Sequence, residues 1–548
     1  MAKNLTPPLL DDRQFNLFGA SPKRDVRQRT AADSGRRFVT GDRNLISLCG
    51  TKLEEHLKQA GQKAPFVVSK LLDQQDWRVF ESRYAATGRA PYSPRLMMGL
   101  ILYGVMRGVH SLRELERMAN LDLGCMWVAA GIRPDHSNIC RFITLHHDSL
   151  TQDFFESLTR SILKASGSSS SCVAGDGTVI EAACSHYKLL KEEALKAQLE
   201  QARQEEIRLV QAKTPIDPTL KAKLATLEEA LETFEQRKAA RVSHGKDPAS
   251  LRISVQEPEA MLQPSKRGRG VCPSYKPSAL ANADRIVTAF AVDASSENKV
   301  ISAMLDQSER VGGAPVQELL LDAGYFDNSV IEETLARDIS MLCPEGKTPE
   351  RPKASELFHK SAFTFDEQAQ TYRCPAGQIM LKIESCSGQG KTRKYDLYGG
   401  ADCDNCTMRT NCTAGKNGRT IKRYPEDERR DALRFVMQQP SAREVFRKRK
   451  AMIEPVFSHL RGQQALHRFR RKGLHAVTRE FALHAMAYNL SRAVALLGAM
   501  LIAFLALLTA TKNRNKTKLP HLVRNFITLQ MTTLFLPFAD KNRVQMRC

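Results

Sequence analysis

The stretch Ser171-Cys-Val-Ala-Gly-Asp-Gly-Thr-Val-Ile-Glu-Ala-Ala183 is an apolar run that presents one carboxylate, Asp176, between two glycines. Its small and β-branched residues predict a short buried strand with an acid at its end. The glycines allow backbone or a ligand to approach that acid closely. An Asp between glycines is also a common turn residue, so the stretch alone leaves a purely structural role open.

A second apolar strand ends in the same way. Leu319–Leu321 runs into Asp322-Ala-Gly-Tyr-Phe-Asp327, and a helix pattern follows over Ser329–Ala336. Another strand is predicted over Arg285–Asp293. Alternating strands and helices predict an α/β core with a mixed sheet. The repetition of strand, acid and glycine indicates that Asp176 and Asp322 belong to one site.

A third acid lies in a strongly basic stretch. Ser441-Ala-Arg-Glu444 is a capping box that opens a helix running to Glu454. Pro455 disfavours helical geometry at the residue before it, so we expect Glu454 at a kink or helix junction. The cations from residue 443 to residue 472 are Arg443, Arg447, Lys448, Arg449, Lys450, Arg461, Arg468, Arg470, Arg471 and Lys472, and the only acids there are Glu444 and Glu454. Glu454 is therefore either an ion-pair partner or a metal-binding acid beside cations that hold DNA phosphates.

The composition favours a polyanionic partner. The chain has 548 residues, 82 Lys and Arg against 60 Asp and Glu, and a net charge of +22. This surplus suits nucleic acid, although a basic protein can also be merely soluble. Thirteen cysteines, an odd number, and an N-terminus without an apolar signal core predict a reducing compartment. We therefore expect a cytoplasmic protein of several domains.

The N-terminal third is predicted to be helical after a basic, disordered arm over 1–45. Within 46–165, Pro94–Met106 reads as a buried helix, Ser111 opens a second helix with Glu114, and Ser137 caps a third. The arginines on the latter two, Arg113, Arg117 and Arg141, fit either a helix-turn-helix-like DNA reader or a plain helical bundle.

Two insertions are predicted inside the catalytic region, which spans 166–492. The first, 186–283, holds a helical hairpin whose second arm carries Leu220, Leu224, Leu227, Leu231 and Phe234, and it ends in a basic segment, Lys266–Gly270. The second, 343–430, is cysteine-rich. Its Cys374, Cys403, Cys406 and Cys412 predict either a zinc ribbon or knuckle or ordinary free thiols, because only one C-x-x-C pair is present.

The C-terminal region 493–548 begins with an uncharged run, 493–510, that is just long enough for a membrane span. A buried docking helix is the alternative, and we favour it, so we do not expect a membrane protein.

The sequence resembles the DDE transposases of bacterial insertion sequences, in the group with a Y-R-E-K-like signature. The resemblance is carried by Gly175–Thr178, Leu321–Tyr325, Arg449–Phe457, Arg468–Leu474 and Ala487–Leu490. It implies an RNase H-like fold with Asp176, Asp322 and Glu454 as catalytic residues binding two Mg²⁺ or Mn²⁺ ions; Zn²⁺ at the cysteines stays a possibility that rests on their spacing alone. It implies cleavage at the ends of a mobile element and strand transfer into target DNA, with terminal inverted repeats as partners and no small-molecule substrate. We expect a homodimer on DNA, associated with the bacterial nucleoid.

The signature departs from its usual form. The Tyr position falls on Arg447 or Phe446, the Arg position on Lys450 or Arg449, and the Lys position on Arg461. The predicted DNA-binding residues are Arg447, Arg449, Lys450, Arg461, Arg468, Arg470, Arg471 and Lys472. The alternative function is a non-catalytic DNA-binding or regulatory protein derived from a transposase.

Overall fold

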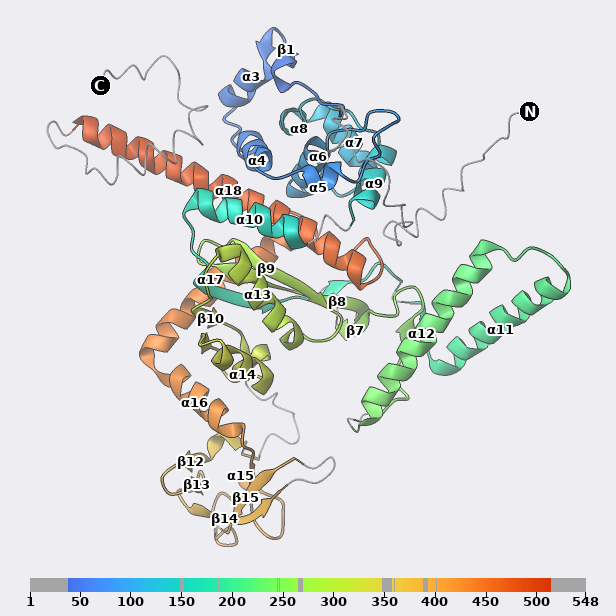
Figure 1. Cartoon of the computed structure of the whole chain (residues 1–548). Helices are drawn as coiled ribbons and strands as arrows, with labels where there is room; N and C mark the ends of the chain where they lie inside the picture. Colours follow the sequence, from blue (N-terminus) through green and yellow to red (C-terminus); the bar gives the residue numbers. More distant parts are fainter. Residues whose placement is uncertain are drawn as a thin grey trace. The chain divides into compact units, whose positions relative to one another are not determined.

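The computed structural model describes residues 38–513, except 148–151, 186, 244, 246, 265–269, 347–356, 359, 388–392 and 401. Most of the predicted arm, residues 266–269 of the basic segment Lys266–Gly270 and the tail beyond 513 therefore lie outside the described residues. The chain is a mixed α/β protein and divides into two compact units (Figure 1). One comprises Met1–Val316 with Arg449–Cys548, and the other comprises Gln317–Lys448.

The first unit begins with the predicted helical region. Its helices are α3 (Leu53–Gln59), α4 (Ala64–Asp73), α5 (Arg78–Glu81), α6 (Pro94–Met106), α7 (Leu112–Leu121), α8 (Leu123–Val128), α9 (His136–Leu145) and α10 (Gln152–Ser166). The minor elements before them are η1 (Arg43–Leu45) and the hairpin β1 (Ser47–Leu48) and β2 (Thr51–Lys52). Helix α6 is buried from Pro94 to Val105, which confirms the predicted central helix. Pro94 occupies its first turn, where no backbone donor is needed.

Three of the predicted helix starts need correction. The helix predicted to open at the Ser441–Glu444 capping box begins at Pro440, so Ser441 lies inside it and is not its N-cap. Ser111 is the N-cap residue of α7, but its side chain makes no capping hydrogen bond. The third helix is capped by Asp135 and not by Ser137, because the Asp135 carboxylate accepts from the Asn138 N–H at 2.6 Å. A carboxylate satisfies a free N–H of the first turn at least as well as a hydroxyl does.

A sheet around β8 (Val271–Asn282) forms the core of the first unit. Strand β8 pairs antiparallel with β3 (Cys172–Gly177), β4 (Ile180–Glu181), β7 (Met261–Pro264) and β9 (Val287–Asp293). The opening stretch of the sequence is thus a strand, as predicted, with Val173 and Ala174 buried. Helices α10, α13 (Ile301–Gly312) and α18 (Leu474–Asn513) pack against β9. The 3-10 turn η2 (Asn298–Val300) leads into α13.

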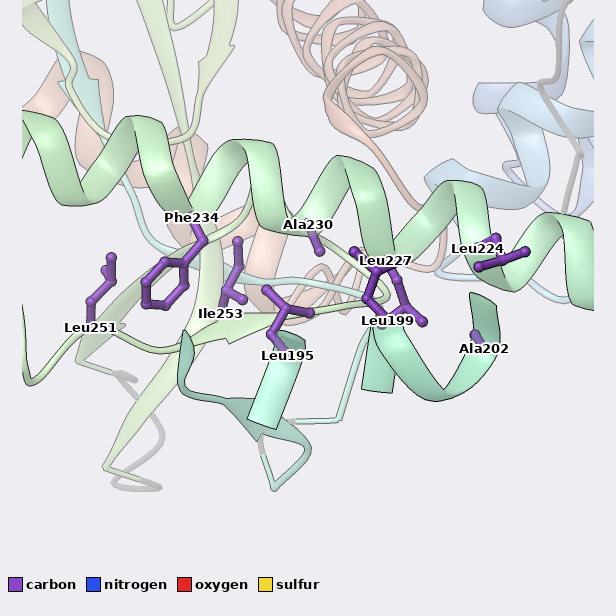
Figure 2. Close-up of a cluster of buried hydrophobic side chains, with 9 residues drawn as sticks. All are labelled: Leu195, Leu199, Ala202, Leu224, Leu227, Ala230, Phe234, Leu251 and Ile253. Atoms are coloured by element: carbon purple, nitrogen blue, oxygen red, sulfur yellow. The ribbon is translucent and has the colours of Figure 1, made fainter. Parts of the chain in front are cut away.

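The helical hairpin is confirmed as α11 (Glu192–Gln211) and α12 (Pro218–Ser243), packed against each other. Figure 2 shows Leu195 and Leu199 of α11 against Leu227 and Phe234 of α12. The short pair β5 (Leu189–Leu190) and β6 (Ile253–Ser254) lies at its base, where Ile253 joins the same cluster. The predicted leucine spacing therefore forms an intrachain seam.

The second unit begins with β10 (Glu318–Leu320), which pairs parallel with β11 (Ser340–Leu342). Between them lie η3 (Ala323–Tyr325) and α14 (Asn328–Ala336). A five-stranded antiparallel sheet follows, in the order β12 (Thr364–Asp366), β13 (Thr371–Arg373), β14 (Ile379–Cys386), β15 (Tyr395–Gly399) and β16 (Ile421–Arg423). The remaining elements of this unit are η4 (Lys360–Ala362), α15 (Arg409–Cys412) and α16 (Asp427–Gln438).

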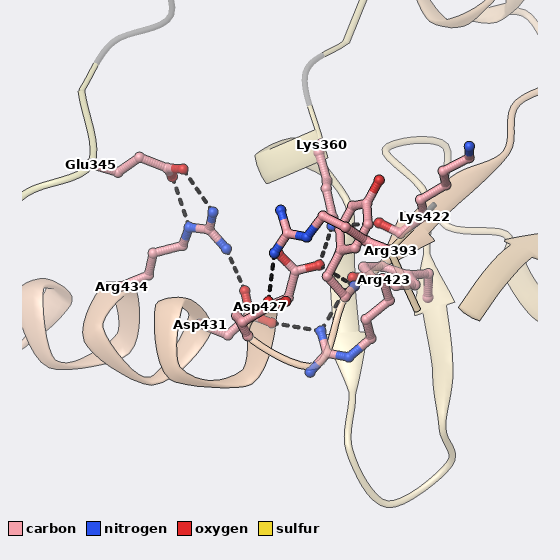
Figure 3. A network of polar contacts seen from close by, with 11 residues as sticks. Glu345, Lys360, Arg393, Lys422, Arg423, Asp427, Asp431 and Arg434 are labelled. Atoms are coloured by element: carbon pink, nitrogen blue, oxygen red, sulfur yellow. Dashed lines mark hydrogen bonds and ion pairs between the residues drawn. The ribbon is translucent and has the colours of Figure 1, made fainter. Parts of the chain in front are cut away.

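A network of ion pairs fixes α16 to the neighbouring sheet (Figure 3). Arg423 of β16 donates to Asp431 of α16 at 2.7 Å. Arg434 makes two 2.7 Å bonds to Glu345 and also pairs with Asp431. Lys360 pairs with Asp427, whose carboxylate accepts from the Tyr424 N–H. Two-pronged arginine contacts of this kind fix orientation, so they hold α16 against its own unit's sheet and loops.

That next helix, α17 (Pro440–Gly462), carries Glu454 and runs through Pro455 without interruption. The prediction of a helix junction at Glu454 is wrong. Proline cannot donate to the carbonyl of Ala451, four residues before it. The Nε–H of Arg285 donates to that carbonyl instead, at 3.0 Å, so the orphan acceptor is satisfied from another element.

The uncharged run at 493–510 lies within α18, whose Ala493 and Leu497 are each 1% exposed. In the part of the chain that the structure describes, no helix combines the length and the apolar character needed to cross a bilayer.

Candidate active site

Asp176 lies near the end of β3, opposite Ala279 of β8. Its side chain is 24% exposed, and its Oδ1 accepts from the Gly177 N–H at 2.9 Å. A Cβ at Gly177 would stand 2.5 Å from Cδ of Glu297. The predicted close approach at Gly177 is therefore present, and the group that approaches is the carboxylate of Glu297.

Arg449 of α17 is the direct partner of this strand end. Its Nη2 donates to the Gly175 carbonyl at 3.0 Å and lies 3.4 Å from Oδ1 of Asp176. The Arg449 side chain is only 8% exposed. We predicted Arg449 to be a DNA-binding residue, but its guanidinium is buried against the protein's own acid and carbonyl.

The position of Arg449 follows from the helix period. The buried residues of α17 are Arg449, Met452, Ile453, Val456, Phe457 and Leu460, which recur at helical spacing. Arg449 is the first member of this buried stripe, and the spacing in the sequence could have revealed it. Lys450 and Arg447 lie off the stripe and are exposed, as a phosphate-binding role requires.

Glu454 is also off the stripe and exposed. Arg461 follows it by seven residues, two helical turns, and therefore shares its face of α17. Burial lowers the pKa of Arg461, and the charge of Asp176 raises it, so Arg461 lies within electrostatic range of that acid. Arg461, on the face of α17 that carries Glu454, thus interacts electrostatically with Asp176.

Asp322 follows β10 in the second unit and is the N-cap residue of η3. Its side chain accepts from the Gly324 N–H at 2.9 Å, and its carbonyl accepts from the Cys343 thiol at 3.0 Å. The predicted sequence of strand, acid, glycine and helix is confirmed, with α14 starting at Asn328.

The second basic segment, Arg468–Lys472, follows α17 and is held in place through its backbone N–H groups. Glu480, which is 7% exposed, accepts from the N–H groups of Arg470 and Arg471 at 3.0–3.1 Å. Burial raises the pKa of Glu480. Arg468 donates to the carbonyls of Ala182 and Cys184, which anchors the segment beside β4. We did not predict this role for Glu480, because its partners are backbone amides that no side-chain pattern marks.

The four predicted zinc ligands line one small cavity, together with Phe363 and Met380. Burial raises the pKa of the Cys412 thiol, Arg419 lowers it, and the charges of Cys403, Cys374 and Cys406 raise it again, so the four thiols lie within electrostatic range of one another. Among the described residues, however, no group of three or more His, Cys, Asp or Glu is placed to hold a metal ion.

The acids have the chemistry that a hard divalent cation requires, since Mg²⁺ binds carboxylate oxygens. Asp176 already accommodates a positive charge, the guanidinium of Arg449. The donor chemistry of these acids therefore suits a divalent cation, although the described residues place no three such groups together and a cation at Asp176 would compete with Arg449.

Two segments of the chain match known protein families. Residues 373–494, which include the four cysteines, Glu454 and the basic segment, match the family described as Transposase DDE domain. Residues 54–145, which span α4 to α9, match a family described as Transposase domain. No curated protein and no solved structure matches the chain.

Both matched segments thus belong to transposase families, which confirms the resemblance to DDE transposases of insertion sequences. The matches indicate a transposase, and a DDE domain indicates an enzyme of the nuclease and transposase type.

Proposed function

We propose that this protein is a metal-dependent DNA transposase that cleaves at the ends of a mobile element and joins the freed strand to target DNA. The observation that supports it most is Asp176 at the end of β3, paired at 3.4 Å with Arg449 from the helix that carries Glu454.

The strand pattern supports an RNase H-like core. Strands β3, β8 and β9 are consecutive antiparallel neighbours in the first unit, and β10 and β11 form a parallel pair in the second. We propose that Asp322, which follows β10, acts together with Asp176 and Glu454 as the three catalytic acids.

In this proposal Asp176, Asp322 and Glu454 hold two Mg²⁺ or Mn²⁺ ions. Such ions activate the attacking oxygen and stabilise the leaving oxygen in phosphodiester displacement. The chain's own contribution is positioning. Arg449 fixes the backbone at Gly175, and the Glu480 carboxylate fixes the basic segment. The phosphates of the terminal repeats and of the target are held by the basic residues of α17 and of the segment after it: Arg447, Lys450, Arg461, Arg468, Arg470, Arg471 and Lys472. The protein acts as a homodimer on DNA in the bacterial cytoplasm.

Cleavage of an end-containing duplex tests the proposal. Asp176→Ala, Asp322→Ala and Glu454→Gln should each reduce Mg²⁺-dependent nicking by at least about 1,000-fold while end binding persists. The matched control is Glu444→Gln, an exposed acid ten residues earlier in the same helix, which should retain activity. Nicking by all three variants at the wild-type rate would refute the proposal. DNA binding without nicking by the wild type would favour the non-catalytic alternative.

We further propose that Cys374, Cys403, Cys406 and Cys412 draw together around a structural Zn²⁺. Soft thiolates are preferred zinc ligands, and the module's apolar cluster is small (Phe363, Tyr372, Met380, Tyr398, Cys412 and Ile421). Metal analysis of the purified protein should give about one zinc per chain, falling to none in Cys403→Ser. Cys386→Ser, outside the cavity, should keep its zinc. A metal-free wild type with an intact fold would contradict this assignment.

A further inference from the structure

A second basic site lies at the base of the helical hairpin. A cleft of about 710 Å³ is lined by Arg237 and Arg241 of α12, Arg252 of the following loop, and Leu251, Met261 and Ser295 among others. Ligand sites commonly have about 300–1,000 Å³, so the cleft has room for a molecule. It lies between the two matched transposase segments, so neither family match accounts for it.

The arginines of this cleft are positioned by neutral groups. Arg237 donates to the carbonyls of Glu259 at 2.8 Å and Ala260 at 3.2 Å. Arg241 donates to the carbonyl of Asp247 at 3.1 Å and to Ser250 Oγ at 2.8 Å. Within the described part of the chain, neither of them nor Arg252 forms an ion pair with a carboxylate. Two cations held by hydrogen bonds, Arg237 and Arg241, and the exposed Arg252 therefore line one cleft whose lining contains no acid.

The rest of the lining is apolar or hydroxylic. Leu251, Met261 and Leu262 supply an apolar wall, and Ser295 and Ser296 supply hydroxyl groups. Cations and hydroxyls suit phosphate oxygens, whereas an apolar wall suits the carbon atoms of the sugars between them. This combination distinguishes a nucleotide chain from a small inorganic anion, which would leave the apolar wall uncovered.

The cleft lies on the same sheet as Asp176. Strand β8 carries Ala279 opposite Asp176 and Ser274 opposite Met261, a separation of five residues. At about 3.3 Å per residue this is about 17 Å along the strand, the span of about five base steps at 3.4 Å each. Positions five apart on β8 face opposite sides, and β7 and β3 lie on opposite edges of β8, so a DNA strand at Asp176 would reach the cleft only by passing around the sheet.

We propose that this cleft binds a segment of DNA backbone outside the cleavage site, as a subsite separate from the basic helix α17. The identity of the ligand rests on the proposed transposase function, but the binding itself needs no catalysis. The hairpin is then a DNA-holding insertion, and its leucine seam serves to fix Arg237 and Arg241.

Binding of a fluorescein-labelled 30-bp duplex, measured by anisotropy in EDTA across a salt series, tests the proposal. Each lost phosphate contact lowers the slope of log K against log salt by about 0.9. The Arg241→Gln/Arg252→Gln variant should therefore lose about 1.8 from the slope and bind about 10- to 60-fold more weakly at 0.1 M salt. The matched control is Arg203→Gln/Arg208→Gln on the same hairpin, whose arginines pair with Glu228 and Glu205. It should change less than twofold.

Arg241 supports the loop at Ser250, so a folding defect is the alternative explanation for a loss in the double variant. The single variant Arg252→Gln, at an exposed side chain, excludes that explanation and should lower the slope by about 0.9. Equal losses in the cleft and control variants, or no loss in either, would overturn the proposal. Binding of labelled poly-glutamate at the cleft, with no binding of DNA, would overturn the proposal in favour of an acidic protein partner. The binding assay contains no divalent metal. Its outcome therefore does not depend on whether the acid variants lose nicking, and the two proposals can fail separately.

Discussion

Replacing Arg449 by Gln should loosen the end of β3. The Arg449 guanidinium lies 3.4 Å from Asp176 Oδ1 and donates to the Gly175 carbonyl at 3.0 Å. Two unit charges at that separation attract by about 1 kcal/mol in water and by about 5 kcal/mol at an effective dielectric constant of 20. Arg449 is 8% exposed and Asp176 24%, so the pair lies between these limits. We expect a coupling energy of about 1–3 kcal/mol.

The measurement is a double-mutant cycle with Asp176→Asn, read by hydrogen exchange of peptides that cover β3. Local exchange is preferred to a melting curve, because a chain with two compact units need not unfold in one step. The coupling energy is the amount by which the two single changes together exceed the double change. Lys450→Gln, an exposed neighbour in the same helix, is the control and should leave the exchange of β3 unchanged.

The same variants separate a structural ion pair from a metal-binding acid. A cation that binds Asp176 must compete with Arg449, so Arg449→Gln should bind Mg²⁺ more tightly than the wild type. With Mg²⁺ at ten times its dissociation constant, protection of β3 should increase by about 1.4 kcal/mol, and Asp176→Asn should abolish this gain. A coupling below about 0.5 kcal/mol, or a Mg²⁺ response that survives Asp176→Asn, would refute the reasoning.

Two further perturbations test the helical region and the hairpin. Burial lowers the pKa of His146 to about 3, against about 6.5 for an ordinary histidine, so the helical region should be most stable above pH 6.5. Its stability should fall by about 2 kcal/mol between pH 6.5 and pH 5 as the unfolded state takes up the proton, and His146→Gln should remove that fall in exchange measurements; an unchanged pH dependence would contradict the assignment. Leu227→Ala, at a side chain 1% exposed, should lower hairpin stability by about 2–5 kcal/mol without altering exchange in β9, whereas a loss below about 1 kcal/mol would show that the seam is loosely packed.

The elements that could be predicted from the sequence are those with a strong local signal. The strand at Asp176, the buried helix at Pro94 and the leucine hairpin each have a period or a punctuating residue that fixes their type. The N-cap of α9 was placed two residues too late, because Asp135 and Ser137 are both good caps and only the backbone decides between them. Helix α16 was not predicted, since its charged sequence draws its order from the ion pairs with the neighbouring sheet and not from an apolar stripe.

The candidate site was predicted at the level of its acids but not of the groups that hold them. Pro455 correctly marks a missing backbone donor, yet the helix continues because Arg285, 166 residues earlier, supplies that donor to Ala451. No local pattern marks this partner, since it depends on the turn between β8 and β9, which carries Arg285, meeting α17 in space. The basic stretch likewise reads as uniform in the sequence, whereas the fold divides it into Arg449, buried in the apolar stripe, and Arg447 and Lys450, which face solvent.

This division changes what the departure from the Y-R-E-K-like signature implies. If Arg449 took the signature's Arg position, that arginine would be a positioning residue for the first acid and not a phosphate contact. Lys450, exposed one residue later, then remains free to hold the backbone as a point charge. If the tyrosine position is Arg447, the departure removes a stacking surface and adds a cation at an exposed position of the same helix; if it is Phe446, an aromatic ring is kept. DNA binding by a chain with a cation in place of the tyrosine should depend more on salt concentration and less on the identity of the base at the cleavage point, because phosphate contacts carry no sequence information.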